Sequence, residues 1–280
     1  MASSGKSRRS KNSGPTGSSS SQERRTAQRE ALRKQRQAEL RRQRNLRTLV
    51  ISLITVAALV IVAGIGYGIY RATRPAGPVA YPAGIAQGQT YFEAGAPEDS
   101  GKPVVDLYMD FMCPYCGQFH QVNGKDIDKL VADNDITLHL HMRRFLDQNS
   151  STGDYSTRSA NAAACVYDDD PDNIMKFQDL LFNNQPEEGS AGLDDKTLIS
   201  YAEKAGASDD VAGCINHQTY KRWVREVVEP EAASRDAGTP AVFINDEQWS
   251  ANSNDWSTKG ALKKAIEKAA QGKSSDGGKG

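Results

Sequence analysis

The residues best suited to chemistry are Cys113 and Cys116, which are separated only by Pro114 and Tyr115. Two thiols at this spacing serve either as a redox dithiol or as half of a zinc site. A zinc site of this kind needs two more Cys or His ligands at a matching spacing, and His120 alone does not supply them. The spacing therefore favours a redox dithiol with no bound metal.

The residues around this CPYC motif indicate a strand that leads into a helix. Val104–Met112 is rich in β-forming residues and ends directly at Cys113, and we expect a helix from there to about Val131. The unbonded N–H groups and the dipole at a helix N-terminus stabilise an anion, so the pKa of Cys113 should be lowered and Cys113 should be the nucleophile. Cys116, one turn further along, is placed to resolve the mixed disulfide. Pro114 suits the first helical turn, where its missing N–H costs no hydrogen bond.

The elements after the motif predict an α/β domain with a helical insertion. Ile136–Met142 alternates apolar and polar residues, which predicts a second strand, parallel to the first and reached by a right-handed crossover. The insertion, about 146–236, has helical patterns at 156–167, 171–183, 195–204 and 217–235. The chain then shows a strand, a turn, a strand and a closing helix, at 241–245, 246–247, 248–250 and about 257–270.

This order of elements resembles the DsbA-like branch of the thioredoxin superfamily. The tetrapeptide alone is weak, because glutaredoxins share CPYC, but the order of elements, strand, CPYC helix, strand, helical insertion, Thr-Pro, strand, strand and helix, separates the two groups. The resemblance covers about 89–270 and is closest to the membrane-anchored actinobacterial type, which has a second cysteine pair in the helical region. It implies a thioredoxin-like α/β fold with an inserted helical subdomain, preceded by one transmembrane helix, and a thiol:disulfide oxidoreductase activity.

The resemblance also implies roles for individual residues. In that family a cis-proline faces the dithiol, and Thr239 and Pro240 match its position, where they would support the binding of an extended substrate. Tyr115 departs from the strongly oxidising members, which have a His beside the second Cys, so the oxidising strength stays open. Asp110 is not at the spacing usual for a buried acid in thioredoxins. It either contacts the active site or is a charge at the exposed end of the strand.

Two other pairs of residues have weaker patterns. Cys165 and Cys214 are 49 positions apart in the predicted insertion, which favours a structural disulfide, although a second exchange pair is the alternative. Neither has the low-pKa setting of a CxxC motif. His139 and His141 alternate along one strand without a third ligand, so we assign them no function.

The charge of the chain is strongly divided although the net charge is zero. Residues 1–47 contain 14 basic and three acidic residues, which leaves 21 basic and 32 acidic residues of the 35 of each kind. Residues 48–70 carry no charge, and about 20 apolar residues suffice to cross a bilayer. The excess of Arg before this segment predicts a cytoplasmic N-terminus and an extracytoplasmic catalytic domain. A leader of 47 residues is long for a signal peptide, although Ala76–Ala86 leaves cleavage open.

The remaining boundaries follow from composition. Residues 1–47 should be a basic cytoplasmic tail, disordered at first and helical from about Gln22, which contacts anionic lipid rather than nucleic acid. Proline, glycine and alanine mark 71–88 as a linker to the folded domain at 89–270. The polar segment 271–280 should be a disordered tail.

Together these features predict an enzyme that introduces disulfides into exported proteins, by dithiol exchange and without a cofactor. Its partners would be unfolded exported proteins with free thiols, and a membrane redox partner would reoxidise it. Two alternatives stay open: an extracytoplasmic reductase or isomerase, and a binding module in which CPYC is a constitutive structural disulfide.

Overall fold

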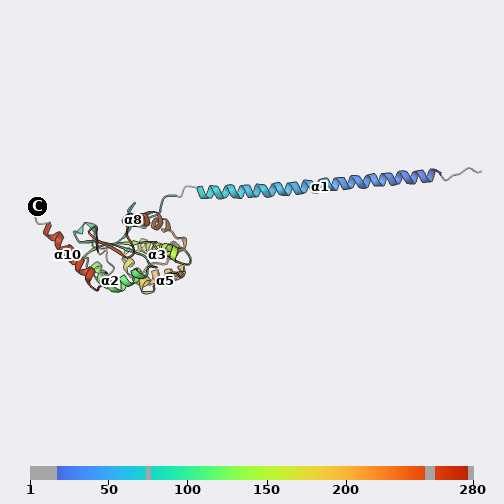
Figure 1. The fold of residues 1–280 in the computed structure, drawn as a ribbon. Coiled ribbons are helices and arrows are strands. Elements are labelled where there is room, and N and C mark those ends of the chain that lie inside the picture. Colours follow the sequence, from blue (N-terminus) through green and yellow to red (C-terminus); the bar gives the residue numbers. More distant parts are fainter. Residues whose placement is uncertain (1–17, 74–76, 250–255, 277–280) are drawn as a thin grey trace, which may run out of the picture. The chain divides into compact units, whose positions relative to one another are not determined.

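The computed structural model describes residues 18–73, 77–249 and 256–276 of the 280-residue chain. By internal contacts the chain forms two units, Met1–Gly77 and Pro78–Gly280. The first unit contains a single long helix, and the second contains a sheet with helices on it (Figure 1). Each unit is described by itself.

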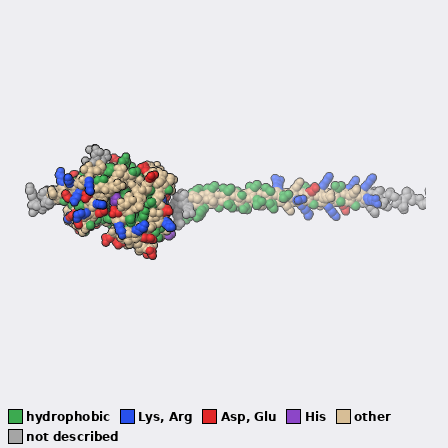
Figure 2. Space-filling view, turned by 90° about the horizontal axis from the view of Figure 1, so that it is seen from below, with side chains coloured by type: hydrophobic (Ala, Val, Ile, Leu, Met, Phe, Trp, Pro, Cys, Tyr) green, Lys and Arg blue, Asp and Glu red, His purple; other side chains and the backbone are tan. Residues whose placement is uncertain are grey.

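Helix α1 (Ser18–Thr73) joins the predicted basic and apolar segments without a break. Basic side chains gather on its N-terminal part and apolar ones on its C-terminal part (Figure 2). The stretch Arg24–Tyr70 is long and apolar enough to cross a membrane and has no part buried against protein, as in a membrane anchor or a signal sequence. The predicted disorder of the tail lies mostly at residues 1–17, outside the described residues, whereas Ser18–Gln22 is already helical.

The sheet of the second unit has five strands in the order β1-β3-β2-β4-β5. Strands β2 and β3 are parallel, which confirms the predicted crossover through α2, and the other neighbouring strands are antiparallel. The first strand, β1, was not predicted, because its four residues have no alternating pattern. The strand bounds are β1 Phe92–Gly95, β2 Val104–Met109, β3 Thr137–Met142, β4 Ala241–Ile244 and β5 Glu247–Trp249.

The helices surround this sheet, and one of the predicted helices is broken. Helix α6 ends at His217, and the left-handed backbone of the next residue, Gln218 (φ 50°), turns the chain. The expected helix 217–235 therefore starts later, and a π-helical turn interrupts it. Pro230 follows this turn and cannot donate to the carbonyl four residues before it, which is a known cause of such widening. The α-helices are α2 Pro114–Ala132, α3 Tyr155–Asp169, α4 Ile174–Asn183, α5 Asp195–Ala205, α6 Val211–His217, α7 Lys221–Trp223, α8 Glu229–Ser234 and α10 Ala261–Asp276; the π-helix is Val224–Val228, and short 3-10 turns are η1 Glu98–Ser100, η2 Asp147–Asn149 and η3 Pro171–Asn173.

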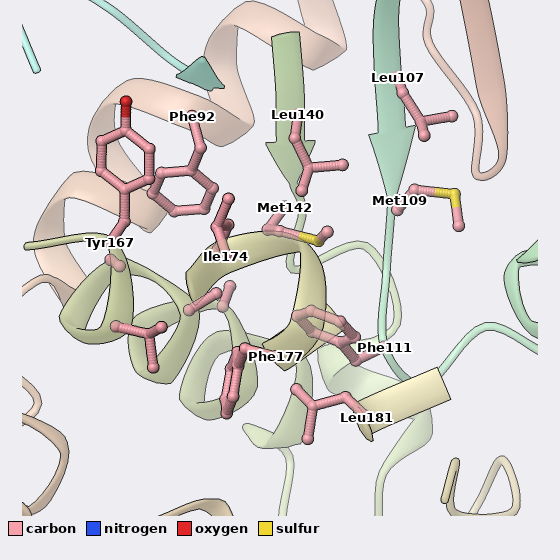
Figure 3. Close-up of a cluster of buried hydrophobic side chains, with 14 of the residues drawn as sticks. Phe92, Leu107, Met109, Phe111, Leu140, Met142, Tyr167, Ile174, Phe177 and Leu181 are labelled. Atoms are coloured by element: carbon pink, nitrogen blue, oxygen red, sulfur yellow. The ribbon is translucent and has the colours of Figure 1, made fainter. Parts of the chain in front are cut away.

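The core lies between the sheet and the inserted helices. Figure 3 shows Phe92 of β1 against Tyr167 of α3, with ring centroids 4.9 Å apart. Leu140 of β3 and Phe177 of α4 are completely buried in the same cluster. Because β2 and β3 are covered on both faces, even their polar residues are buried, which the alternating pattern of β3 did not indicate.

Two predicted boundaries are wrong. The expected linker 71–88 belongs to the folded unit from Pro78 onward, since Ile85 is buried and the Ala83 N–H donates to Asp168 Oδ1 at 2.6 Å. The Pro and Gly residues of this segment form turns on the domain surface. A segment without regular secondary structure can still pack against the domain through its side chains. Of the expected tail 271–280, the part as far as Asp276 continues helix α10, and residues 277–280 lie outside the described residues.

Candidate active site

The dithiol lies at the start of α2. Cys113 is the N-cap residue, Pro114 is the first helical residue, and the N–H of Cys116 donates to the Cys113 carbonyl at 3.0 Å. Both thiols are free and buried, with Cys113 4% and Cys116 0% exposed. The strand is shorter than the predicted 104–112. It ends at Met109, and a short loop connects it to the helix.

The surroundings of Cys113 favour its thiolate. A hydrogen bond from the Cys116 thiol lowers the pKa of Cys113, and burial opposes this effect. Thr239 and the backbone N–H groups of Cys116 and Tyr115 lower it further, so that the pKa is about 6 instead of the usual 9.0. At neutral pH Cys113 is therefore the thiolate of the pair.

Cys116 has the opposite character. Complete burial raises the pKa of its thiol well above the usual value, and the negative charge of Cys113 raises it further. One helical turn thus holds a reactive thiolate and a protonated thiol. This asymmetry is what dithiol exchange needs, with one sulfur that is attacked or released and another that resolves the mixed disulfide.

Strand β4 brings Thr239 and Pro240 to the dithiol from 126 positions away. The bond between these two residues is cis, and the Cys113 thiol donates to the Thr239 carbonyl at 3.3 Å. The antiparallel pairing of β4 with β2 sets this contact, because β4 begins directly after Pro240 at Ala241. The structure thus brings Thr239 and Pro240, which the resemblance singled out, next to the dithiol of Cys113 and Cys116.

Asp110 lies beneath the dithiol and is fully buried, so the exposed-end alternative is wrong. Its own N–H points at Cys116 Sγ, at 3.4 Å. Its carboxylate accepts hydrogen bonds from the N–H groups of Leu146 and Met112 and from the Ser156 hydroxyl, each at 2.8 Å. Burial raises the pKa of Asp110 to about 7 in spite of these donors.

Gln185 is a site residue that sequence reasoning missed. Its side-chain amide donates to the carbonyls of Phe111 (3.1 Å) and Cys113 (2.8 Å), on either side of the turn into α2. A Cβ at Gly117 would come within 2.1 Å of Gln185 Oε1, so this glycine makes room for the side chain. Gln185 lies in a loop after α4 and has no motif around it that could have pointed to this contact.

The rim of the site exposes aromatic side chains. Tyr115 is 60% exposed and meets Trp256 edge to face, with centroids 6.4 Å apart. Phe145, next to the Leu146 N–H that bonds Asp110, is 53% exposed. A small pocket beside Pro240 is lined by Val242, Trp249 and Trp256, among others. The rim therefore offers exposed apolar contacts next to the dithiol.

A family model described as Thioredoxin matches residues 95–268. The chain belongs to the thioredoxin family. Two solved structures from Mycobacterium tuberculosis agree with this assignment and place the chain in the DsbA-like branch of thiol:disulfide oxidoreductases. The reduced form of the disulfide bond oxidoreductase DsbG is 31% identical with a TM-score of 0.55, covering 64% of this chain and 86% of that one. Oxidised DsbA is 30% identical with a TM-score of 0.55, covering 64% and 92%.

A longer relative matches half of the chain. The serine/threonine-protein kinase PknE of Mycobacterium tuberculosis is 32% identical over 147 residues, which is 50% of this chain and 26% of the kinase. The chain thus spans about a quarter of that protein. The likeness carries nothing about kinase activity to this thioredoxin-family chain.

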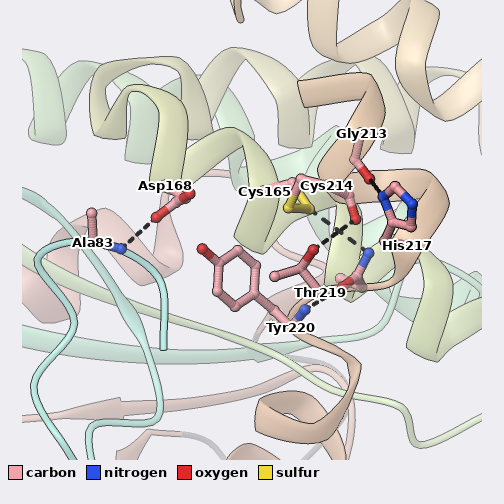
Figure 4. The surroundings of a disulfide bond; sticks show 9 residues. Ala83, Cys165, Asp168, Gly213, Cys214, His217, Thr219 and Tyr220 are labelled. Atoms are coloured by element: carbon pink, nitrogen blue, oxygen red, sulfur yellow. Dashed lines mark hydrogen bonds between the residues drawn. A yellow bond between two sulfur atoms is a disulfide. The ribbon is translucent and has the colours of Figure 1, made fainter. Parts of the chain in front are cut away.

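The second cysteine pair lies in the inserted helices of the thioredoxin-like domain. Cys165 of α3 and Cys214 of α6 form a disulfide (Figure 4). Next to it, Asn161 Oδ1 accepts from the Tyr220 N–H at 2.8 Å, and the Thr219 hydroxyl donates to the Cys214 carbonyl at 3.3 Å. Cys165 is almost completely buried, so the bond joins two helices inside the subdomain.

Proposed function

We propose that the chain is a disulfide donor for exported proteins, with Cys113 as the nucleophile and Cys116 as the resolving cysteine. The observation that carries the proposal is the opposite shift of the two pKa values within one helical turn, down for Cys113 and up for Cys116. A stabilised Cys113 thiolate is a good leaving group and favours the reduced form of the enzyme, which makes the oxidised form the donor.

Donation proceeds in two balanced steps. A substrate thiolate attacks Sγ of Cys113 in the oxidised enzyme, so that the Cys113–Cys116 bond breaks and Cys116 leaves with the electron pair and takes up a proton. A second substrate thiolate then attacks the substrate sulfur of the mixed disulfide and releases Cys113 as its thiolate. The substrate gains a disulfide, and the enzyme keeps two electrons as its dithiol.

Asp110 supports this cycle as the proton carrier of the buried thiol. Cys116 is inaccessible to water, so its proton needs a neighbouring group. The backbone N–H of Asp110 lies 3.4 Å from the Cys116 sulfur, and the carboxyl group of the same residue has a pKa near neutrality. A protonated Asp110 can give a proton to the leaving Cys116, and an ionised one can take it back during reoxidation. Asp110 thereby acts on the step in which Cys116 leaves, and on its reverse, in which Cys116 attacks and resolves a mixed disulfide.

The anchor and the rim fit substrates that are still unfolded. The arginines before the apolar part of α1 favour a cytoplasmic N-terminus, which would hold the domain outside the membrane, where exported chains emerge. Tyr115 and Phe145 give the rim exposed apolar contacts, which suit varied sequences. Each cycle leaves the dithiol reduced, so a membrane redox partner must reoxidise it.

The reduction potential of the dithiol tests the direction. The full chain in detergent is equilibrated against glutathione buffers, and the oxidised fraction of the Cys113–Cys116 peptide is read by mass spectrometry, which separates it from Cys165 and Cys214. A potential well above roughly −200 mV supports a disulfide donor. One near about −270 mV, the thioredoxin value, makes the enzyme a reductase, and a pair that no buffer reduces is a structural disulfide.

A further inference from the structure

The polar face of the sheet contains a second cluster of functional groups. Along β2, Leu107 joins the main core, whereas Asp106 and Tyr108 point to the other face. There His139 and His141 of β3 lie beside Asp106, and all three are at most 5% exposed. They line a cavity of about 370 Å³ that also reaches Tyr91 and Glu98. The dithiol exchange derived above uses none of these groups.

His139 has one ring nitrogen without a partner. Its Nδ1 is 3.1 Å from Asp106 Oδ1, whereas the buried Nε2 has no hydrogen bond. Because Nδ1 faces the Asp106 carboxylate, Nε2 is the ring nitrogen left for a ligand. A buried polar atom left unpaired in this way is costly unless something binds to it.

Two carboxylates lie next to this imidazole. Glu93 of β1 is the direct cross-strand partner of His139, and Glu98 comes from η1. One ligand atom from each of the three residues lies within 4.8 Å of the others. In the described parts of the chain neither carboxylate makes an ion pair with a basic side chain. The cluster therefore carries a negative charge. Next to it, the Arg235 guanidinium lies 3.7 Å from the Asp106 carboxylate.

We infer that Glu93, Glu98 and His139 form a binding site for a divalent transition metal ion of the zinc class. Imidazole nitrogen with carboxylate oxygen is a donor set of zinc and its neighbours, whereas calcium and magnesium take oxygen ligands. Asp106 supplies the carboxylate–histidine pair that orients such a ligand, and Tyr91, stacked on the imidazole at 3.8 Å, fixes the plane of the ring.

The spacing requires a small closure of the site. Ligand atoms around a tetrahedral zinc ion are about 3.4 Å apart, from bonds of about 2.1 Å. The separation of up to 4.8 Å must therefore shrink, and exposed Glu98 has the rotamer freedom to do this. Binding would join β1 and η1 to β3 away from the dithiol, so the ion stabilises the fold and takes no part in thiol exchange. From the sequence, the two histidines alone did not indicate a metal site. The acids Glu93 and Glu98 come from a segment that the sequence analysis did not pair with β3.

The test uses the full chain in detergent, with the dithiol oxidised so that thiolates cannot bind the ion. Zinc uptake after chelator treatment is measured by equilibrium dialysis with elemental analysis, and the melting temperature is measured with and without zinc. Glu98→Gln is the main variant, because this exposed side chain is not needed for folding; Glu93→Gln is the second. Glu187→Gln, another exposed acid without a side-chain contact in the described structure, is the matched control.

We expect one zinc ion per chain and a rise in melting temperature for the wild type and Glu187→Gln. Both site variants should bind at least tenfold more weakly and lose the rise. Cobalt should give a visible spectrum without a sulfur charge-transfer band. Equal uptake by wild type and Glu98→Gln, or tighter binding of calcium than of zinc, would overturn the inference. Thiol exchange by the metal-free chain should be unchanged, so failure here is separate from failure of the proposed function.

Discussion

Gln185 donates its side-chain amide to the backbone carbonyl of Cys113 at 2.8 Å, across 72 positions of sequence. Gln185 belongs to the helical insertion, and Cys113 belongs to the thioredoxin-like core. The same amide also bonds Phe111, so the insertion holds both sides of the turn that presents the dithiol. The inserted helices are therefore part of the active-site framework as well as a cover over the sheet.

Removing this contact should weaken the site. Gln185→Ala removes the amide donor from the Phe111 and Cys113 carbonyls, of which the Cys113 carbonyl keeps the N–H groups of Cys116 and Gly117. Gly117→Ala displaces the same side chain. Each should lower the free energy of unfolding by about 1–2 kcal/mol and slow thiol exchange, and the double variant should show little further loss. Chemical denaturation and exchange kinetics measure both effects. Gly213→Ala, where an added Cβ meets nothing within 4 Å, is the control. Additive losses would contradict a shared contact.

The reactivity of Cys113 should change near pH 6. Its pKa of about 6 predicts that alkylation of the reduced enzyme rises with a midpoint there, while Cys116 stays unreactive. Because this pKa is depressed, the thiolate stabilises the reduced fold above the ordinary thiol pKa, and this contribution is lost as the pH falls through about 6. The oxidised enzyme has no such thiolate and serves as the control for stability. A midpoint between about 8 and 9 would show an ordinary thiol.

Asp110→Asn should remove a pH dependence from the resolving step. The acid has a pKa of about 7, so the rate at which the mixed disulfide resolves should change around neutral pH in the wild type. The variant should be about tenfold slower or more and show no inflection there. Stopped-flow release of a chromophoric thiol gives the rate. Asp209→Asn, an exposed acid on the insertion, should behave as the wild type.

The same carboxyl group should affect stability with the opposite sign to Cys113. Because burial raises the pKa of Asp110, its ionisation costs stability as the pH rises from about 4 through 7. Asp110→Asn should remove this pH dependence, which denaturation at several pH values would show. An unchanged profile would mean that another group titrates there.

The disulfide between Cys165 and Cys214 should contribute stability without taking part in exchange. On the loop-entropy model, closing 49 positions contributes about 4 kcal/mol, so the double alanine variant should lose about 2–4 kcal/mol. Thiol exchange by the folded variant should stay close to that of the wild type. A folded variant that lost exchange activity would favour the second exchange pair instead.

The sequence by itself determined the local features. Three features could be recognised from short stretches of sequence alone. They are the βα junction with CPYC at the helix start, the Thr-Pro before a strand and the uncharged run of 23 residues. The parallel pairing of β2 and β3 could also be predicted from the sequence, because two neighbouring strands joined by a crossover helix run parallel.

Only the tertiary structure decided which residues far apart in the sequence come into contact and how far each is exposed to solvent. The burial of Asp110, the contact of Gln185 with the turn, and the meeting of Glu93 and Glu98 with His139 all depend on packing between segments far apart in the chain. A pKa or a ligand set depends on desolvation and on neighbours within a few ångströms, and neither is encoded by local spacing. Strand β1 is the clearest case, since its four residues gain their structure only by pairing with β3.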